Sequence, residues 1–139
     1  MVEVVQLTET TAMVVQARQK AGQRDFDGAL ATTEEAISKT PGSFEAWKLK
    51  GDLLRYSKNE LPAALVAYRK TVEIKPDFLA GQAAVITVLL QQNNLADATT
   101  QVESLKKIAP NHPQTKFLEA HLAFQKKEYK AARELIQLV

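Results

Sequence analysis

The chain has 139 residues, with 18 Lys and Arg against 16 Asp and Glu, and its formal net charge of +2 attracts a phosphate backbone only weakly. It contains no cysteine, which excludes a disulfide framework and a thiolate metal site. No run of about 18 apolar residues occurs, so the sequence predicts no membrane-spanning helix.

Taken in chain order, the first segment is short and apolar, and eight helices are expected after it. Residues 1–9 have no basic flank and are too short for a signal sequence, so we expect an N-terminal extension. Glycine and proline are confined to turns and helix starts, which favours helices over strands. The expected helices span residues 10–22, 26–39, 44–58, 61–74, 79–92, 95–108, 113–126 and 129–139.

One pattern recurs at the start of every second helix, at steps of 35, 34 and 34 residues. A polar residue that can cap a helix precedes a large apolar residue, and an alanine follows three positions later. The four copies begin at Asp25-Phe26, Glu60-Leu61, Asn94-Leu95 and Glu128-Tyr129. Proline follows the alanine by twelve residues at Pro41, Pro76 and Pro110 and is expected to end the helix.

The first helix of the second copy adds a second motif, in which Trp47, Gly51 and Leu54 share one helical face. Together the two motifs resemble the tetratricopeptide repeat family. The resemblance implies an all-α fold, a right-handed α-solenoid of antiparallel helix pairs with seven to eight helices. It places a repeat domain at residues 10–139, with repeats at about 10–43, 44–78, 79–112 and an incomplete one at 113–139.

Three departures from the family pattern concern local packing. Lys50 stands where the family has leucine, and Ile86 stands where it has a small residue. One extra residue lengthens the turn around Ser57 to Asn59. Phe26, Trp47, Tyr68 and Tyr129 occupy family core positions, so we expect them to pack inside.

Residues suited to catalysis or metal binding are sparse. His112 lies in a turn, and His121 has no second ligand three or four residues away on its helix. The adjacent carboxylates Glu34 and Glu35 are expected on a solvated face. We therefore expect no catalytic residue, metal or cofactor, and predict that the protein is not an enzyme.

The resemblance also implies a binding surface, because the first helices of such repeats line a concave groove. A groove holding both charged and aromatic side chains suits a partner peptide or helix with a charge and an apolar anchor. The candidate residues are Arg18, Lys48, Asp52, Arg55, Tyr56, Thr87, Gln91, Phe117, His121 and Phe124. The expected function is a protein-interaction scaffold; the alternative is that these exposed positions are merely polar.

Other functional interpretations stay open. The phrases Lys50-Gly51-Asp52-Leu53-Leu54 and Lys75-Pro76-Asp77-Phe78 resemble tetratricopeptide lipoproteins of Gram-negative bacteria that serve exosortase and exopolysaccharide export. This resemblance implies a periplasmic scaffold; otherwise the compartment is open and could be cytoplasmic. A helical-repeat nucleic-acid binder or an enzyme accessory subunit is disfavoured.

The last helix leaves apolar residues with nothing to cover them. It ends Leu135-Ile136-Gln137-Leu138-Val139 without the proline turn that closes the earlier copies. Terminal repeats need a polar outer face. We therefore expect either that the natural protein continues with further repeats or that the isolated chain pairs tail to tail through this helix.

Overall fold

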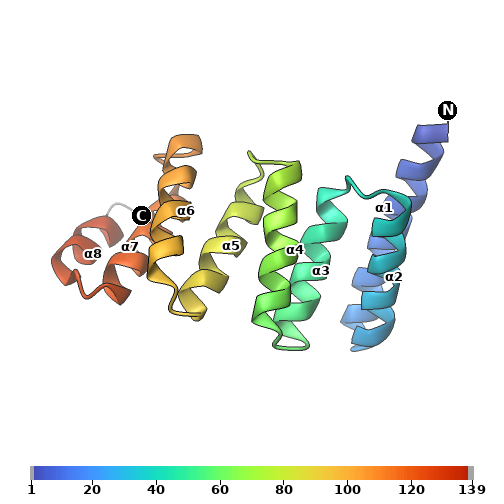
Figure 1. Ribbon diagram of the computed structural model, residues 1–139, viewed down its shortest axis with the longest axis horizontal. Helices are drawn as coiled ribbons and strands as arrows, with labels where there is room; N and C mark the ends of the chain where they lie inside the picture. Colours follow the sequence, from blue (N-terminus) through green and yellow to red (C-terminus); the bar gives the residue numbers. More distant parts are fainter. Residues whose placement is uncertain (1, 138–139) are drawn as a thin grey trace. The chain divides into compact units, whose positions relative to one another are not determined.

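A computed structural model describes residues 2–137, and within this range it contains eight helices and no strand (Figure 1). Short turns join the helices in sequence, and the two helices of each pair, α1 and α2, α3 and α4, α5 and α6, and α7 and α8, run in opposite directions. Their bounds are α1 Val2–Gly22, α2 Phe26–Lys39, α3 Phe44–Tyr56, α4 Leu61–Ile74, α5 Leu79–Gln91, α6 Leu95–Ile108, α7 Pro113–Gln125 and α8 Tyr129–Ile136.

The predicted helix starts are confirmed for α2 to α8, and the differences have local causes. Helix α1 begins at Val2, eight residues earlier than predicted, because no glycine or proline precedes Gly22 to interrupt it. Helix α3 ends at Tyr56, since the backbone reverses at Asn59, where φ is 54°. The predicted end of the last helix, at residue 139, lies outside the described residues.

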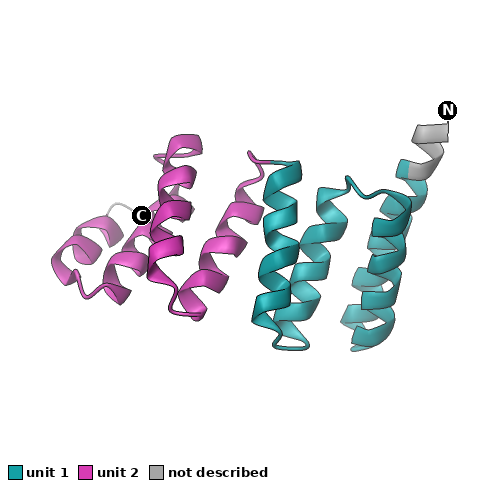
Figure 2. Cartoon of the chain, in the orientation of Figure 1, with its two compact units in different colours: residues 1–75 teal, residues 76–139 magenta. Residues whose placement is uncertain are grey.

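The chain divides into two compact units, residues 1–75 and residues 76–139 (Figure 2). In the first unit α1 packs on α2 and α3 on α4, and α3 also packs on both α1 and α2. In the second unit α5 pairs with α6 and α7 with α8, and α7 packs on both α5 and α6. The two units therefore share one arrangement: the first helix of the second pair packs on both helices of the first pair.

The turn inside each helix pair has one geometry in all four copies. One residue adopts a left-handed backbone conformation two positions before the second helix: Arg24, Asn59, Asn93 and Lys127, with φ of 66°, 54°, 57° and 66°. The next amide donates to a carbonyl near the end of the first helix, at 2.8 Å from Asp25 to Lys20, 2.9 Å from Asn94 to Leu89 and 2.8 Å from Glu128 to Ala123. These bonds satisfy carbonyls that the helix end leaves unpaired.

The extra residue of the second copy lies in this turn, as predicted. There the amide of Glu60 donates to the carbonyl of Leu54 at 2.8 Å, reaching back six residues, whereas the other three turns reach back five. The left-handed residue and the closing hydrogen bond are both kept. The insertion is therefore absorbed within the turn.

The polar residues before the second helices lie at the N-cap, but only some of them cap through the side chain. Asp25 accepts from the amide of Gly28 at 3.0 Å, and Asn94 accepts from the amide of Asp97 at 3.3 Å. Glu60 and Glu128 make no such bond. Short side chains reach the first-turn amides best, so the pattern predicts the helix start better than it predicts the cap.

The turns between copies are held by a bond from the next first helix. Trp47 donates its indole N–H to the carbonyl of Pro41 at 2.8 Å. Gln82, which holds the same position one repeat later, donates its amide N–H to the carbonyl of Pro76 at 2.9 Å. Glutamine at this position therefore makes the same hydrogen bond as tryptophan but lacks the packing of the indole ring.

The small residue at the centre of α3 has a steric role. A Cβ atom on Gly51 would place three ring atoms of Tyr68 within 3.0 Å, and Tyr68 is fully buried. Helices α3 and α4 can therefore hold this ring between them only because position 51 is glycine.

The other two departures from the family pattern are also accommodated. Lys50 forms a 2.8 Å ion pair with Glu34, and its ammonium group lies 5.2 Å from the ring centre of Trp47. Ile86 is fully buried in α5, so the larger side chain is enclosed. A charge replaces one apolar contact, and a branched side chain replaces a small one, without change to the helix order.

Candidate functional site

The candidate groove residues all lie on the first helices of the pairs, as predicted, and fall into two sets, each described within its own unit. The first unit holds Arg18 on α1 and Lys48, Asp52, Arg55 and Tyr56 on α3. The second unit holds Thr87 and Gln91 on α5 and Phe117, His121 and Phe124 on α7.

Two of the candidate charges on α3 are joined to the buried tyrosine. Lys48 Nζ lies 2.9 and 3.1 Å from the two carboxylate oxygens of Asp52. Tyr68 donates its hydroxyl to Asp52 Oδ1 at 2.6 Å. Burial of the ring and this hydrogen bond raise the pKa of Tyr68 well above its usual range. Lys48 and Asp52 therefore stabilise the fold as well as presenting charge.

The end of α3 carries an open cationic and aromatic pair. Tyr56 is 73% exposed, and the guanidinium carbon of Arg55 lies 4.6 Å from its ring centre. Arg55 also hydrogen-bonds Tyr68, which opposes part of the rise in the pKa of Tyr68. Arg55 thus contacts the buried Tyr68 on one side and the exposed ring of Tyr56 on the other.

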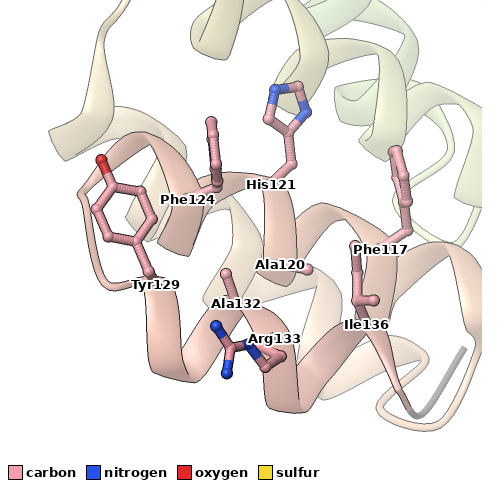
Figure 3. A pocket seen from close by; sticks show the side chains of 8 residues that line it. All are labelled: Phe117, Ala120, His121, Phe124, Tyr129, Ala132, Arg133 and Ile136. Atoms are coloured by element: carbon pink, nitrogen blue, oxygen red, sulfur yellow. The ribbon is translucent and has the colours of Figure 1, made fainter.

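In the second unit a hollow of about 500 Å³ opens between α7 and α8 (Figure 3). Its lining residues are Phe117, Ala120, His121, Phe124, Tyr129, Ala132, Arg133 and Ile136. The four large apolar side chains among them are 51 to 60% exposed. Phe117 and His121 meet edge to face with ring centres 6.2 Å apart, and Phe124 and Tyr129 do so at 5.5 Å.

This hollow includes three of the predicted groove residues and corrects one core prediction. Tyr129 was expected inside with Phe26, Trp47 and Tyr68, but it is 54% exposed, because no described helix covers that side of α8. Arg133 was not predicted as a site residue. Only its helical spacing from Tyr129 and Ile136 could have indicated it.

The remaining candidate residues lie outside the two surfaces described above. Thr87 donates its hydroxyl to the carbonyl of Ala83 in its own helix at 2.8 Å, which leaves no hydroxyl proton for a ligand. Arg18 and Gln91 are exposed. The histidine outside the set, His112, accepts from the amide of Gln114 at 3.0 Å and so caps α7.

Among the side chains that the structure describes, those of residues 7–137, no group of three His, Cys, Asp or Glu comes together as a possible metal site. None of the helices in residues 2–137 is both long and apolar enough to cross a bilayer.

Comparison with known proteins supports the repeat interpretation. Residues 14–77 match the model of a tetratricopeptide repeat family. Among solved structures, "MamA RS-1 ArsTM double mutant" aligns with a TM-score of 0.79 at 15% identity, covering 93% of this chain and 72% of its own. "Crystal structure of MamA" aligns with the same score at 12% identity, covering 93% of this chain and 75% of its own. The curated proteins contain no match.

At these identities the structural likeness concerns the fold alone, and it confirms the all-α solenoid class predicted from the sequence. The matches named here do not bear on the narrower resemblance to export-associated lipoproteins, which stays a prediction. Residues 14–77 match the tetratricopeptide repeat family, and the same turn geometry and helix pairing recur in all four helix pairs.

Proposed function

We propose that the chain is a non-catalytic scaffold that binds a partner peptide or helix on the groove side of its first helices. The single observation that carries this proposal is the pair Arg55 and Tyr56. The ring of Tyr56 is 73% exposed and lies beside the guanidinium group of Arg55, which Tyr68 fixes by a hydrogen bond. The two side chains therefore form a pre-ordered anchor for a partner. Arginine and tyrosine are the residue types that most often dominate protein-binding energy.

The rest of the first unit's set supports the same interpretation. Lys48 and Asp52 lie on α3 within one to two turns of Arg55, and their side chains are 24% and 30% exposed. They are fixed by hydrogen bonds to one another and to Tyr68, so a partner would meet them without an ordering cost. The surface favours a segment that offers an apolar side chain to Tyr56 and a carboxylate to Arg55.

A selection from a phage-displayed library of random peptides, with the purified chain as bait, tests this proposal. We expect Arg55→Ala and Tyr56→Ala each to weaken the selected peptide by about 1–3 kcal/mol, or about 5- to 150-fold in Kd. Lys70→Ala on α4 is the matched control and should bind like the parent. Equal losses in the control, or none in the α3 variants, would contradict the groove assignment.

The sequence and structure also support self-association through the C-terminal helix pair. Phe117, Phe124, Tyr129 and Ile136 leave an apolar surface that is open in the isolated chain. Covering such side chains is worth roughly 1.5–3 kcal/mol each, so a protein surface is the expected partner here.

A further inference from the structure

We propose that the hollow between α7 and α8 is the docking site for α1 of a second copy of this chain, so that copies associate head to tail. This inference names the partner face of the self-association proposed above and rests on it. It does not depend on peptide binding at Arg55 and Tyr56.

The hollow is the exposed counterpart of the core in the first helix pair. An offset of 103 residues relates α1 and α2 to α7 and α8 throughout. It pairs Val14 with Phe117, Ala17 with Ala120, Ala21 with Phe124, Phe26 with Tyr129, Ala29 with Ala132 and Leu30 with Arg133. The first member of every pair belongs to one hydrophobic cluster or packs against it, and every second member lines the hollow.

In the first unit this cluster is completed by a third helix. Helix α3 contributes Ala46, Leu49 and Leu53, which are at most 7% exposed. The second unit repeats the arrangement 69 residues later, where α7 packs on α5 and α6 and buries Thr115, Leu118 and Leu122. A helix with small or apolar residues at this spacing is therefore what such a surface receives.

Helix α1 has a face equivalent to the one that α3 buries with Ala46, Leu49 and Leu53, but on α1 this face is exposed to solvent. Thirty-four residues before the α3 set lie Ala12, Val15 and Gln19, all of them exposed, with Val15 at 46%. The face continues toward the N-terminus as a second hollow of about 450 Å³ lined by Leu7, Thr8, Thr11 and Ala12. Helices α3 and α7 bury this face against the preceding helix pair, whereas on α1 the same face is exposed.

The two open faces also match in size, and their pairing avoids contact between like charges. Val15 is smaller than its counterpart Leu49, whereas Phe117 is larger than its counterpart Val14, so the volumes compensate. The α1 face named above holds no charged residue, whereas the hollow holds Arg133. Joining α1 to the hollow therefore sets no like charges together, while joining two hollows would bring Arg133 against its own copy.

When α1 of one copy binds the hollow of another, the dimer still has one free α1 face and one free hollow. Association should therefore continue beyond a dimer. Sedimentation of the chain over a range of concentrations tests this, and we expect the mass to rise past twice that of the chain. Val15→Glu on α1 and Phe117→Glu in the hollow should each raise the concentration needed for association by at least about tenfold.

Mixing the two variants gives the decisive result. At concentrations where the parent associates, neither variant should associate alone, but an equimolar mixture retains one intact face of each kind and should form a one-to-one dimer and nothing larger. Val66→Glu on α4, a site 67% exposed, is the matched control and should associate like the parent. Circular dichroism should show unchanged helicity in all three variants, since each substitution is at an exposed position.

Three outcomes would overturn the inference. A chain that stays monomeric at every concentration excludes self-association altogether. Dimers that survive Val15→Glu but not Phe117→Glu show tail-to-tail pairing instead. Loss of selected-peptide binding in Phe117→Glu, with a monomeric parent, assigns the hollow to a partner segment. Because Val15→Glu leaves Arg55 and Tyr56 intact, peptide binding by that variant tests the groove separately.

Discussion

At the scale of single residues, Tyr68 links the fold of the first unit to its surface. Its ring fills the space that Gly51 leaves, and its hydroxyl reaches Asp52, whose carboxylate also holds Lys48. One buried side chain thus fixes the positions of two candidate binding charges. The two substitutions below separate its steric role from its hydrogen bond.

Gly51→Ala should destabilise the chain although alanine is the better helix former. The added Cβ meets a rigid, fully buried ring, and overpacking of this kind costs about 1–3 kcal/mol, against a propensity gain of about 1 kcal/mol. Gly22→Ala, at the end of α1, has nothing within 4 Å of the new atom and should be neutral or slightly stabilising. Urea unfolding of both variants measures the difference; equal midpoints would show that the α3 and α4 contact is loose.

The raised pKa of Tyr68 predicts a loss of stability at alkaline pH. The folded chain holds the phenol proton more tightly than the unfolded chain, so the stabilisation is complete below the unfolded pKa of about 10 and declines as the pH rises above it. Urea midpoints at about pH 8 and about pH 11 should differ more in the parent than in Tyr68→Phe, which keeps every lysine. An equal pH dependence would mean that Tyr68 ionises as freely in the folded chain.

At the scale of helices and turns, the helix starts follow from the repeat pattern, whereas individual caps depend on side-chain length. The polar position before the second helix is occupied in all four copies, yet Asp25 and Asn94 cap and Glu60 and Glu128 do not. The sequence therefore predicts where these helices begin. The repeat pattern asks only for a polar residue at this position and does not separate Asp from Glu, although the one additional methylene group of Glu accompanies the loss of the side-chain cap.

Asp25→Ala should cost about 1 kcal/mol of unfolding free energy, since the amide of Gly28 loses its acceptor at the positively polarised end of α2. Glu60→Ala is the control at the equivalent position without a side-chain cap and should change stability by less than about 0.5 kcal/mol. Thermal or urea unfolding compares them. A larger loss in Glu60→Ala would show that charge alone, without the hydrogen bond, stabilises these helix starts.

Lys127→Gly should stabilise α7 and α8 by about 0.5–1 kcal/mol, because a left-handed backbone is strained for lysine and free for glycine. Lys126→Gly, one residue earlier and in a right-handed conformation, should instead be neutral or destabilising. Denaturant midpoints measure both. A gain in the neighbouring variant alone would place the strain at a different residue of the turn.

The site was less predictable than the fold for a related reason. Periodicity predicts which helix and which face a residue occupies, and the candidate groove residues do lie on the first helices; their role in binding stays a prediction. Exposure depends on what covers that face. Tyr129 shares its position in the repeat with partly buried Phe26, yet it is exposed, because α3 packs on the first pair and no described helix packs on the last.

At the scale of the whole molecule, each unit consists of two helix pairs that pack on one another, α1 and α2 with α3 and α4, and α5 and α6 with α7 and α8. Stability in such stacks is approximately a sum of local terms. A core change in the second unit should therefore act mainly there, and the first unit should keep its own core around Val14, Ala46 and Leu49.

Leu105→Ala in α6 tests this locality. The side chain is fully buried, so truncation should cost about 2–5 kcal/mol. Hydrogen exchange should speed up in α5 to α8 while the amides of α1 and α2 keep most of their protection. A uniform rise in exchange along the chain would mean that the two units unfold as one cooperative block.

The longer turn between α3 and α4 has a practical consequence. It keeps the left-handed residue and the closing bond from Glu60 to Leu54 despite its additional residue, so this turn accepts one inserted residue without losing the hydrogen bond that closes it. Lys58 and Asn59 are exposed, which makes this the natural place to graft a foreign epitope or a fluorescent label. A repeat protein of this kind can therefore gain new material between its helices while its register is preserved.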